Sequence, residues 1–118
     1  MKLMEIINMQ KVGCLVLAVA SLLWNVSAFS GTTTGLVNEI YVHYNHDRLL
    51  FSMTSSDPMF TACATTKRYV VSTSSQQGKN VLSAVLAAKA AQQEITVVGL
   101  NTCNVHQDSE TVQYLIVR

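Results

Sequence analysis

The 118-residue sequence has little charge, one proline and few glycines. Charged side chains make up 13% of the residues, and the formal net charge is +1. A near-neutral chain lacks the strongly basic surface that nucleic-acid-binding domains ordinarily use. One proline and five glycines exclude the collagen-like, proline-rich and glycine-linker classes. The length allows one domain and no more.

Apolar residues are concentrated near the start of the sequence. The uncharged run from Val12 to Trp24 has 13 residues, too few for a helix to cross a hydrocarbon core of roughly 30 Å. Val26 and Ala28 then fill the small-residue positions of a signal-peptidase site. The pattern predicts a secretory signal peptide over residues 1–28 and a single mature domain over residues 29–118. An uncleaved anchor is the alternative, which the short apolar run disfavours; after cleavage we expect no membrane span.

Two of the three cysteines, Cys63 and Cys103, lie in the predicted mature domain. An exported chain meets an oxidising compartment, so we expect this pair to form a disulfide. Closing a loop of about 40 residues stabilises a fold by about 4 kcal/mol in the chain-entropy description. A free catalytic thiol needs a reducing compartment or an isolated cysteine, and is disfavoured. The expected location is secreted or periplasmic.

Alternating β-branched and aromatic residues predict a first strand from Gly35 to Tyr44. Residues 29–34 are small and polar, and we expect them to form a flexible lead-in. Residues 45–47 fit a short turn, so the run from Arg48 to Thr54 is expected to pair with the first strand as a hairpin. Four side chains of the first strand are expected to share one face: Leu36, Ile40, Val42 and Tyr44.

One helix is predicted in the second half of the chain. Ser74 and Ser75 offer capping hydroxyls, and the segment from Gln76 to Gln92 has apolar residues at helical spacing. The stripe expected to face a sheet contains Val81, Leu82, Val85 and Leu86. The three remaining strands are predicted at Lys67 to Thr73, before the helix, and at Glu94 to Leu100 and Thr111 to Arg118, after it.

The order of three strands, one helix and two strands is that of the OB-fold. The sequence therefore predicts a mainly β protein, a five-stranded OB-fold Greek-key barrel with one helix between strands three and four. Ferredoxin-like halves and irregular α+β sandwiches are the alternatives. The single helix and the short separation of the first two strands favour the barrel.

The histidines are the first candidates for a metal site. His43 and His46 are three residues apart beside Asp47, and His106 is near Asp108. A zinc site needs three or four convergent ligands. A histidine on a strand and a histidine in the following turn are expected to diverge. We therefore predict no metal and no cofactor, and interpret these residues as solvated turn and edge positions.

No catalytic motif stands out. Serines and threonines are plentiful, but none lies in a G-x-S-x-G elbow. The segment from Gly78 to Asn80 lacks the flanking residues of a phosphate-binding loop. Asp108 and Glu110 are near neighbours, and their expected role is to keep a loop soluble. The sequence therefore predicts that the protein is not an enzyme.

The usual ligands of an OB-fold are nucleic acids and sugars. The one basic and aromatic group, Lys67, Arg68 and Tyr69, is small for a nucleic-acid surface, and an exported neutral chain is the wrong context. Sugar binding uses hydroxyl, amide and aromatic groups at loops and strand edges. Such groups are abundant: Thr32, Thr33, Thr34, Tyr41, Tyr44, Asn45, Ser55, Ser56, Thr65, Thr66 and Tyr69. Composition alone does not separate a sugar-binding protein from other exported proteins.

Several segments resemble the B subunits of the subtilase cytotoxin and typhoid toxin group. They are Ala62-Cys63, the alanine-rich helix, Val98 to Cys103 and the strand opening at Gly35 to Val37. The resemblance implies an exported OB-fold with a disulfide, assembled as a pentamer, that binds sialylated host glycans and accompanies a catalytic A subunit. In that family a hydroxyl just before the first-strand glycine contacts sialic acid, which implies a ligand-binding role for Thr34.

The outer side of the predicted helix is small and uncharged. Ala84, Ala87 and Ala91 would let a neighbouring backbone approach closely, so we predict that they form an oligomer interface. The alternative is that alanine is simply the best helix former. For function, an exported OB-fold with a non-sugar protein partner is the second hypothesis, and a small enzyme or enzyme inhibitor is the third.

Overall fold

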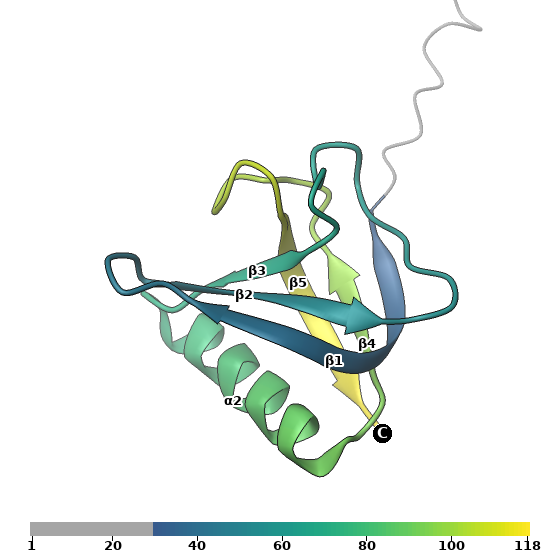
Figure 1. Ribbon diagram of the computed structural model, residues 1–118. Coiled ribbons are helices and arrows are strands. Elements are labelled where there is room, and N and C mark those ends of the chain that lie inside the picture. Colours follow the sequence, from purple (N-terminus) through teal and green to yellow (C-terminus); the bar gives the residue numbers. More distant parts are fainter. Residues whose placement is uncertain (1–29) are drawn as a thin grey trace, which may run out of the picture.

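The computed structural model describes residues 30–118 as five strands and one helix (Figure 1). In chain order these are β1 (Thr32–Val42), β2 (Arg48–Thr54), β3 (Tyr69–Ser72), α2 (Gln76–Ala91), β4 (Ile95–Gly99) and β5 (Glu110–Val117). The predicted signal peptide, residues 1–28, lies outside the described residues.

The strands close into a barrel in the order β1-β2-β3-β5-β4. β1 closes the ring because its first part pairs with β4 and its remainder pairs with β2. β3 and β5 run parallel, whereas the other neighbouring pairs are antiparallel. With the helix between β3 and β4, this is an OB-fold topology. The predicted fold class is confirmed.

β1 begins earlier than the sequence pattern indicates. Thr32, Thr33 and Thr34 pair with β4, so a flexible lead-in over residues 29–34 is wrong for these three positions. Their side chains are small and polar and carry no local apolar alternation. The partner strand, which lies more than 60 residues further along the chain, is what makes them a strand. β1 also ends at Val42 rather than at Tyr44.

A register irregularity between Val37 and Ile40 changes which side chains of β1 face inward. Before it, Thr33 and Val37 are buried and Leu36 is exposed. After it, Ile40 packs against the core. The expectation that Leu36 and Ile40 share one face is therefore wrong, because an extra residue in a bulged strand shifts the alternation.

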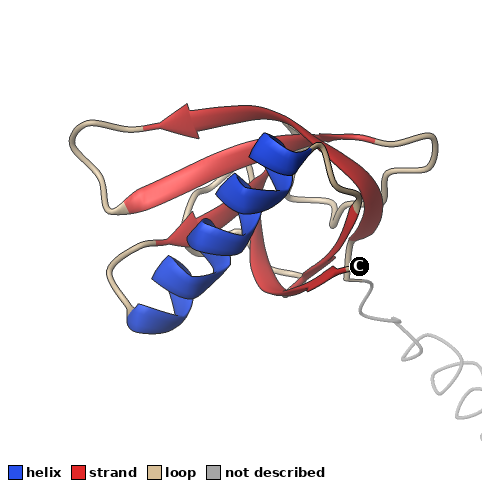
Figure 2. Cartoon of the chain, turned by 90° about the horizontal axis from the view of Figure 1, so that it is seen from below, coloured by secondary structure: helices blue, strands red, loops and turns tan. Residues whose placement is uncertain are grey.

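Helix α2 begins and ends close to its predicted bounds. The Ser75 hydroxyl accepts a hydrogen bond from the Gly78 backbone N–H, and Gln92 ends the helix in a left-handed conformation. The helix lies against the barrel with contacts to β1, β3 and β5 (Figure 2). Its buried face is rotated from the predicted stripe: Ala88 is buried, whereas Leu86 is 46% exposed.

The barrel interior is filled mainly by aliphatic and aromatic side chains. The buried cluster contains Val37, Leu49, Phe51, Tyr69, Val71, Val85, Ala88, Ile95 and Val97. Tyr69 contributes a polar group to this interior: its hydroxyl lies 2.9 Å from the Thr33 hydroxyl and donates to the Met59 carbonyl oxygen at 3.1 Å. Burial raises the pKa of Tyr69 to about 12, so its hydroxyl stays neutral at physiological pH.

A buried carboxyl group joins three parts of the chain. Glu110, at the start of β5, is fully buried, so its expected role in a soluble loop is wrong. Its side-chain oxygens accept hydrogen bonds from the backbone N–H groups of Gly31 at 2.9 Å, Thr61 at 2.6 Å and Asn101 at 3.4 Å. A Cβ atom at Gly31 or Gly99 would collide with this carboxyl group. Two glycines therefore make the space that the buried acid occupies.

The predicted disulfide is confirmed. Cys63, between β2 and β3, is bonded to Cys103, between β4 and β5, with their Cα atoms 6.1 Å apart. The bond holds these two loops together at one end of the barrel, and it indicates an oxidising, extracytoplasmic environment. Among residues 30–118, no helix has both the length and the apolar character needed to cross a membrane.

Candidate functional site

One outer face of the barrel carries a row of threonines. In the register of β4, Thr96 lies beside Thr34 of β1 and Ile116 of β5. One row further along, Val98 lies between Thr32 and Tyr114 in the same way. Paired residues point to the same side of a sheet. These six side chains lie on the outer side of the sheet, where Thr96 is 8% exposed and Val98 is half-buried, and we call this surface the threonine face.

Thr34 lies on the β1 side of this surface, paired with Thr96 of β4. Its side chain is exposed, and its hydroxyl lies 2.8 Å from that of Thr96. A hydroxyl can donate one hydrogen bond and accept two, so the exposed Thr34 hydroxyl keeps capacity for a ligand after bonding to Thr96, which is 8% exposed. Tyr114, on the same face, is 49% exposed and offers an aromatic ring.

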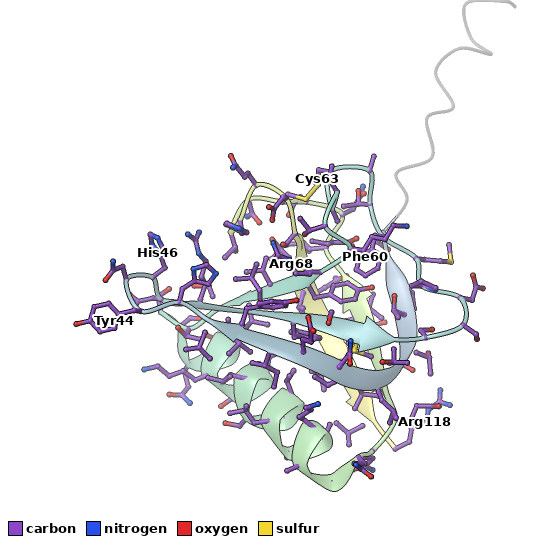
Figure 3. The ribbon with its side chains drawn as sticks, in the orientation of Figure 1. Tyr44, His46, Phe60, Cys63, Arg68 and Arg118 are labelled. Carbon is purple, nitrogen blue, oxygen red and sulfur yellow. A yellow bond between two sulfur atoms is a disulfide. The ribbon has the colours of Figure 1, made fainter. Side chains whose placement is uncertain are left out.

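Of the other hydroxyl and aromatic residues suited to sugar binding, some are exposed and others are buried. Thr33 and Tyr69 are fully buried and hydrogen-bonded to one another, so neither is available to a sugar. Tyr44 is fully exposed at the tip of the β1–β2 hairpin (Figure 3). Tyr41 is half-buried; its hydroxyl bonds to Glu39, and the Arg68 guanidinium lies 5.0 Å from its ring centre.

A second polar site lies where the β1–β2 hairpin meets the β4–β5 loop. The ring of His43 has its centre 6.0 Å from that of His46 and 6.1 Å from that of His106. The expectation that His43 and His46 diverge is therefore wrong. These are the three histidines of the whole sequence, and we call them the histidine cluster. An OB-fold commonly uses these two loops to bind ligands.

Charged side chains surround the histidine cluster. Asp108 lies 3.3 Å from His106 and 3.5 Å from Arg68, and it accepts a hydrogen bond from the Ser109 hydroxyl. The Ser109 hydrogen bond is the largest of the effects that hold the pKa of Asp108 below its usual value. Burial lowers the pKa of His106, with help from the positive charges of Arg48, Arg68 and His43 and against the opposing effect of Asp108.

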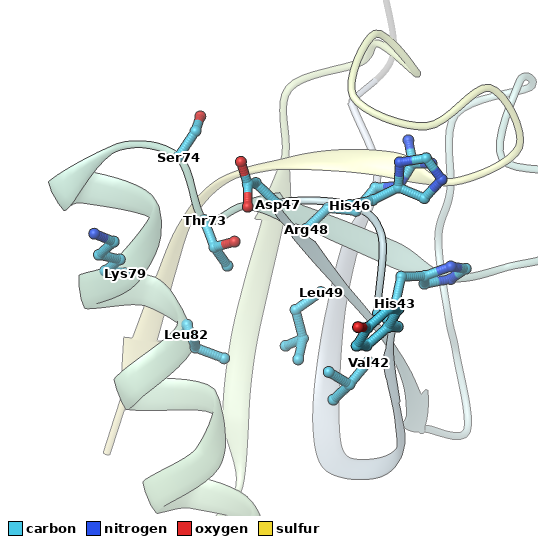
Figure 4. A pocket seen from close by; sticks show the side chains of 11 residues that line it. Val42, His43, His46, Asp47, Arg48, Leu49, Thr73, Ser74, Lys79 and Leu82 are labelled. Carbon is cyan, nitrogen blue, oxygen red and sulfur yellow. The ribbon is translucent and has the colours of Figure 1, made fainter.

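A hollow lies beside the histidine cluster, between the hairpin tip and the beginning of α2 (Figure 4). Its volume is about 740 Å³ and it is open to solvent. His43 and His46 line it from the hairpin, and Lys79 lines it from the helix. The Thr73 backbone N–H donates to the Asp47 carbonyl oxygen at 2.9 Å, which fixes the hairpin tip against the segment before the helix.

Within residues 30–118, no three or more histidine, cysteine or acidic side chains are arranged to hold a metal ion. Sequence reasoning missed the histidine cluster because it considered each histidine within its own segment. The signal that could have found it was the predicted topology, since an OB-fold brings the first hairpin and the last connection to the same end of the barrel.

The three alanines expected at an oligomer interface lie on α2. Ala87 and Ala91 are exposed, whereas Ala84 is half-buried. Leu86, which is exposed on the same helix, adds an apolar side chain to its outer surface.

No family model, curated protein or solved structure matches the chain.

Proposed function

We propose that the protein is an exported glycan-binding subunit of the bacterial toxin B-subunit type. In this proposal the threonine face binds sialylated sugars on a host cell, and a ring of five copies carries or accompanies a catalytic A subunit. The chain itself performs no catalysis and needs no cofactor. Secretion or release into the periplasm follows from the predicted signal peptide and agrees with the disulfide.

The observation that carries the proposal is the pair of neighbouring hydroxyl groups on Thr34 and Thr96, on the same outer face as the exposed ring of Tyr114. A sugar presents many hydroxyls and an apolar ring face, so it is recognised by hydrogen-bonding groups close to an apolar or aromatic surface. Tyr114 and Ile116 supply the apolar part from β5, which pairs with the strand that carries Thr96. The residue that the toxin resemblance assigns to sialic acid, Thr34, is one of the two hydroxyl residues.

Glycan binding is expected to depend on the Thr34 hydroxyl. A glycan array should give sialylated ligands above background, and Thr34→Ala should weaken binding about fivefold, because one hydrogen bond contributes about 1 kcal/mol. Thr34→Ser is the matched control: it keeps the hydroxyl and should bind within about twofold of the original protein. A silent array with folded protein would contradict the proposal, as would equal losses in the two variants.

Assembly is the second testable part of the proposal. Light scattering on the exported protein should give about five times the monomer mass, as expected for a closed ring. Replacing Ala84 and Ala87 with glutamate should give smaller folded species, because charge on a close-packed helix contact is unfavourable. Gln113→Glu adds the same kind of charge at an exposed position on β5 and should leave the mass unchanged. A monomer at micromolar concentration would contradict the ring.

A non-sugar protein partner is the second candidate function. It is favoured by Leu36 and Ile116, which expose 42% and 41% of their surface on the outside of the barrel. An exposed apolar group of this kind is typical of a protein interface. The two functions differ in one result: a protein partner would bind Thr34→Ala normally and would lose affinity when Leu36 is changed to serine.

A further inference from the structure

The histidine cluster brings together side chains that are far apart in the sequence. His43 follows β1, His46 lies in the hairpin turn, and His106 comes from the β4–β5 loop. His43 is central, with ring centres about equally distant from it on both sides. His43 and His46 are exposed, so a ligand can reach them from solvent.

Arg48, which lines the hollow together with His43 and His46, has no carboxylate partner among residues 30–118. Arg48 is half-buried at the start of β2, and its Nη1 donates to the Val105 carbonyl oxygen at 2.9 Å. Its Nε is buried with no hydrogen-bond partner among the described residues. Within residues 30–118, Asp108 is the one carboxylate in an ion pair, and it is shared between His106 and Arg68. The positive charge of Arg48 therefore has no ion pair.

The balance of charge around the cluster changes with pH. Asp47 and Lys79 line the adjoining hollow, Asp108 and Arg68 form an ion pair, and Glu39 is bonded to Tyr41 under the Arg68 guanidinium. With Arg48 included, the formal charges of these three acids and three bases sum to zero while the histidines are neutral. Histidine gains its proton between about pH 5 and pH 8. Protonation of the cluster therefore adds positive charge for which the site has no further carboxylate.

Positively charged side chains near His106 affect its protonation. Burial is the largest of the effects that lower the pKa of His106, and Asp108 raises it; the positive charges of Arg48, Arg68 and His43 lower it further. A bound anion would reverse that effect and favour the protonated ring. Because linkage is reciprocal, protonation of the ring would favour the anion equally.

We propose that His43, His46 and His106, with Arg48, bind a tetrahedral oxyanion, a sulfate or phosphate group, and bind it more tightly in mildly acidic solution. Imidazolium and guanidinium groups supply several N–H donors from different directions, which suits the several acceptor oxygens of such an anion. The site is separate from the threonine face, so it does not depend on the glycan-binding proposal. The oxyanion can be free or can be an ester carried by a larger ligand.

Inorganic sulfate is the direct probe, because its charge stays constant over the pH range in which histidine titrates. The imidazole signals of the folded protein are followed by NMR during sulfate titration at about pH 5.5 and about pH 7.5, with sodium chloride holding the ionic strength. We expect saturable shifts of the histidine cluster and binding about tenfold tighter at the lower pH. We also expect the pKa of His106 to rise in sulfate relative to chloride.

Three substitutions separate this site from general charge attraction. His43→Gln removes the central, exposed ring and should abolish the saturable shifts; His46→Gln should weaken them and provides a second exposed variant. Arg118→Gln removes one positive charge at the end of the molecule opposite His46 (Figure 3) and should leave sulfate binding unchanged. Equal responses to sulfate and chloride, binding independent of pH, or equal losses in His43→Gln and Arg118→Gln would each overturn the proposal.

The source of the anion is distinguished by a second titration. Galactose 6-sulfate is compared with galactose and with inorganic sulfate under the same conditions. Tighter binding of the sulfated sugar than of sulfate assigns the site to an ester on a larger ligand, and equal binding assigns it to the free anion. Equal weak responses to galactose 6-sulfate and galactose would overturn the oxyanion site. Failure of this experiment would leave the sialylated-glycan result at Thr34 unaffected.

Discussion

Replacing Glu110 with glutamine is expected to lower the free energy of unfolding by about 3 kcal/mol. Both side-chain oxygens of Glu110 accept hydrogen bonds from backbone N–H groups. Oε2 accepts from Gly31 and Asn101, and Oε1 accepts from Thr61. Glutamine keeps one acceptor oxygen, but its NH₂ group would then face a backbone donor. The resulting buried donors have no acceptor, and water cannot enter because Glu110 is fully buried.

Urea unfolding followed by circular dichroism measures this change. Glu94→Gln is the matched control, since the same atoms change at an exposed position and the expected effect is within about 0.5 kcal/mol. The substitution is also expected to loosen the chain around Gly31, Thr61 and Asn101, whose amide hydrogens should exchange faster with solvent. A loss below about 1 kcal/mol would contradict the role of this carboxyl group as a central hydrogen-bond acceptor.

Loss of the disulfide is expected to cost about 4 kcal/mol. The Cys63→Ser, Cys103→Ser double variant opens a loop of 40 residues between the two positions and so gives entropy back to the unfolded chain. For a domain of this size, that is a large share of the total stability. Urea unfolding of the double variant and of the oxidised protein measures the difference.

Reduction of the original protein provides an independent test of the same bond. A reductant should lower its unfolding midpoint toward that of the double variant and should leave the double variant unchanged. The bond also holds the β4–β5 loop, which carries His106, so the histidine cluster should become more mobile when the bond is absent. Equal stability of the oxidised protein and the double variant would contradict the expected contribution.

Elements defined by local signals could be predicted from the sequence. β2 has its predicted bounds, from Arg48 to Thr54, because an apolar β-forming run follows a short turn. Helix α2 also begins at its predicted residue, Gln76, because Ser75 provides a capping hydroxyl. The barrel topology follows from the order of such elements, and the Cys63–Cys103 bond follows from an even number of cysteines in an exported domain.

Features that depend on distant partners could not be predicted in the same way. Thr32 and Thr34 become part of a strand only through pairing with β4, and the shift of alternation after Val37 depends on pairing with β2. Burial of Glu110 depends on three N–H donors from other segments and on the two glycines that make room for it. The identity of one acidic residue in the sequence does not show whether its side chain is buried, as in Glu110, or exposed to solvent.

Of the two candidate sites, one is predicted from the sequence and the other is not. Thr34 was identified through a resemblance, and its exposed position beside Thr96 supports the role proposed for it. The histidine cluster was missed because His43 and His46 were judged from their local spacing alone, and His106 lies about 60 residues away. Placing the predicted loops on the predicted barrel before judging the histidines would have brought the three rings to the same end.

The central claim is that the threonine face is the glycan-binding surface. The most direct test is an NMR titration of isotopically labelled exported protein with a sialylated trisaccharide, in which every backbone amide reports on its own surroundings. The account predicts saturable shifts centred on Thr34, Thr96 and Tyr114, with a dissociation constant that rises about fivefold in Thr34→Ala and stays within about twofold in Thr34→Ser. No saturable shift, or shifts confined to another surface of the barrel, would contradict it.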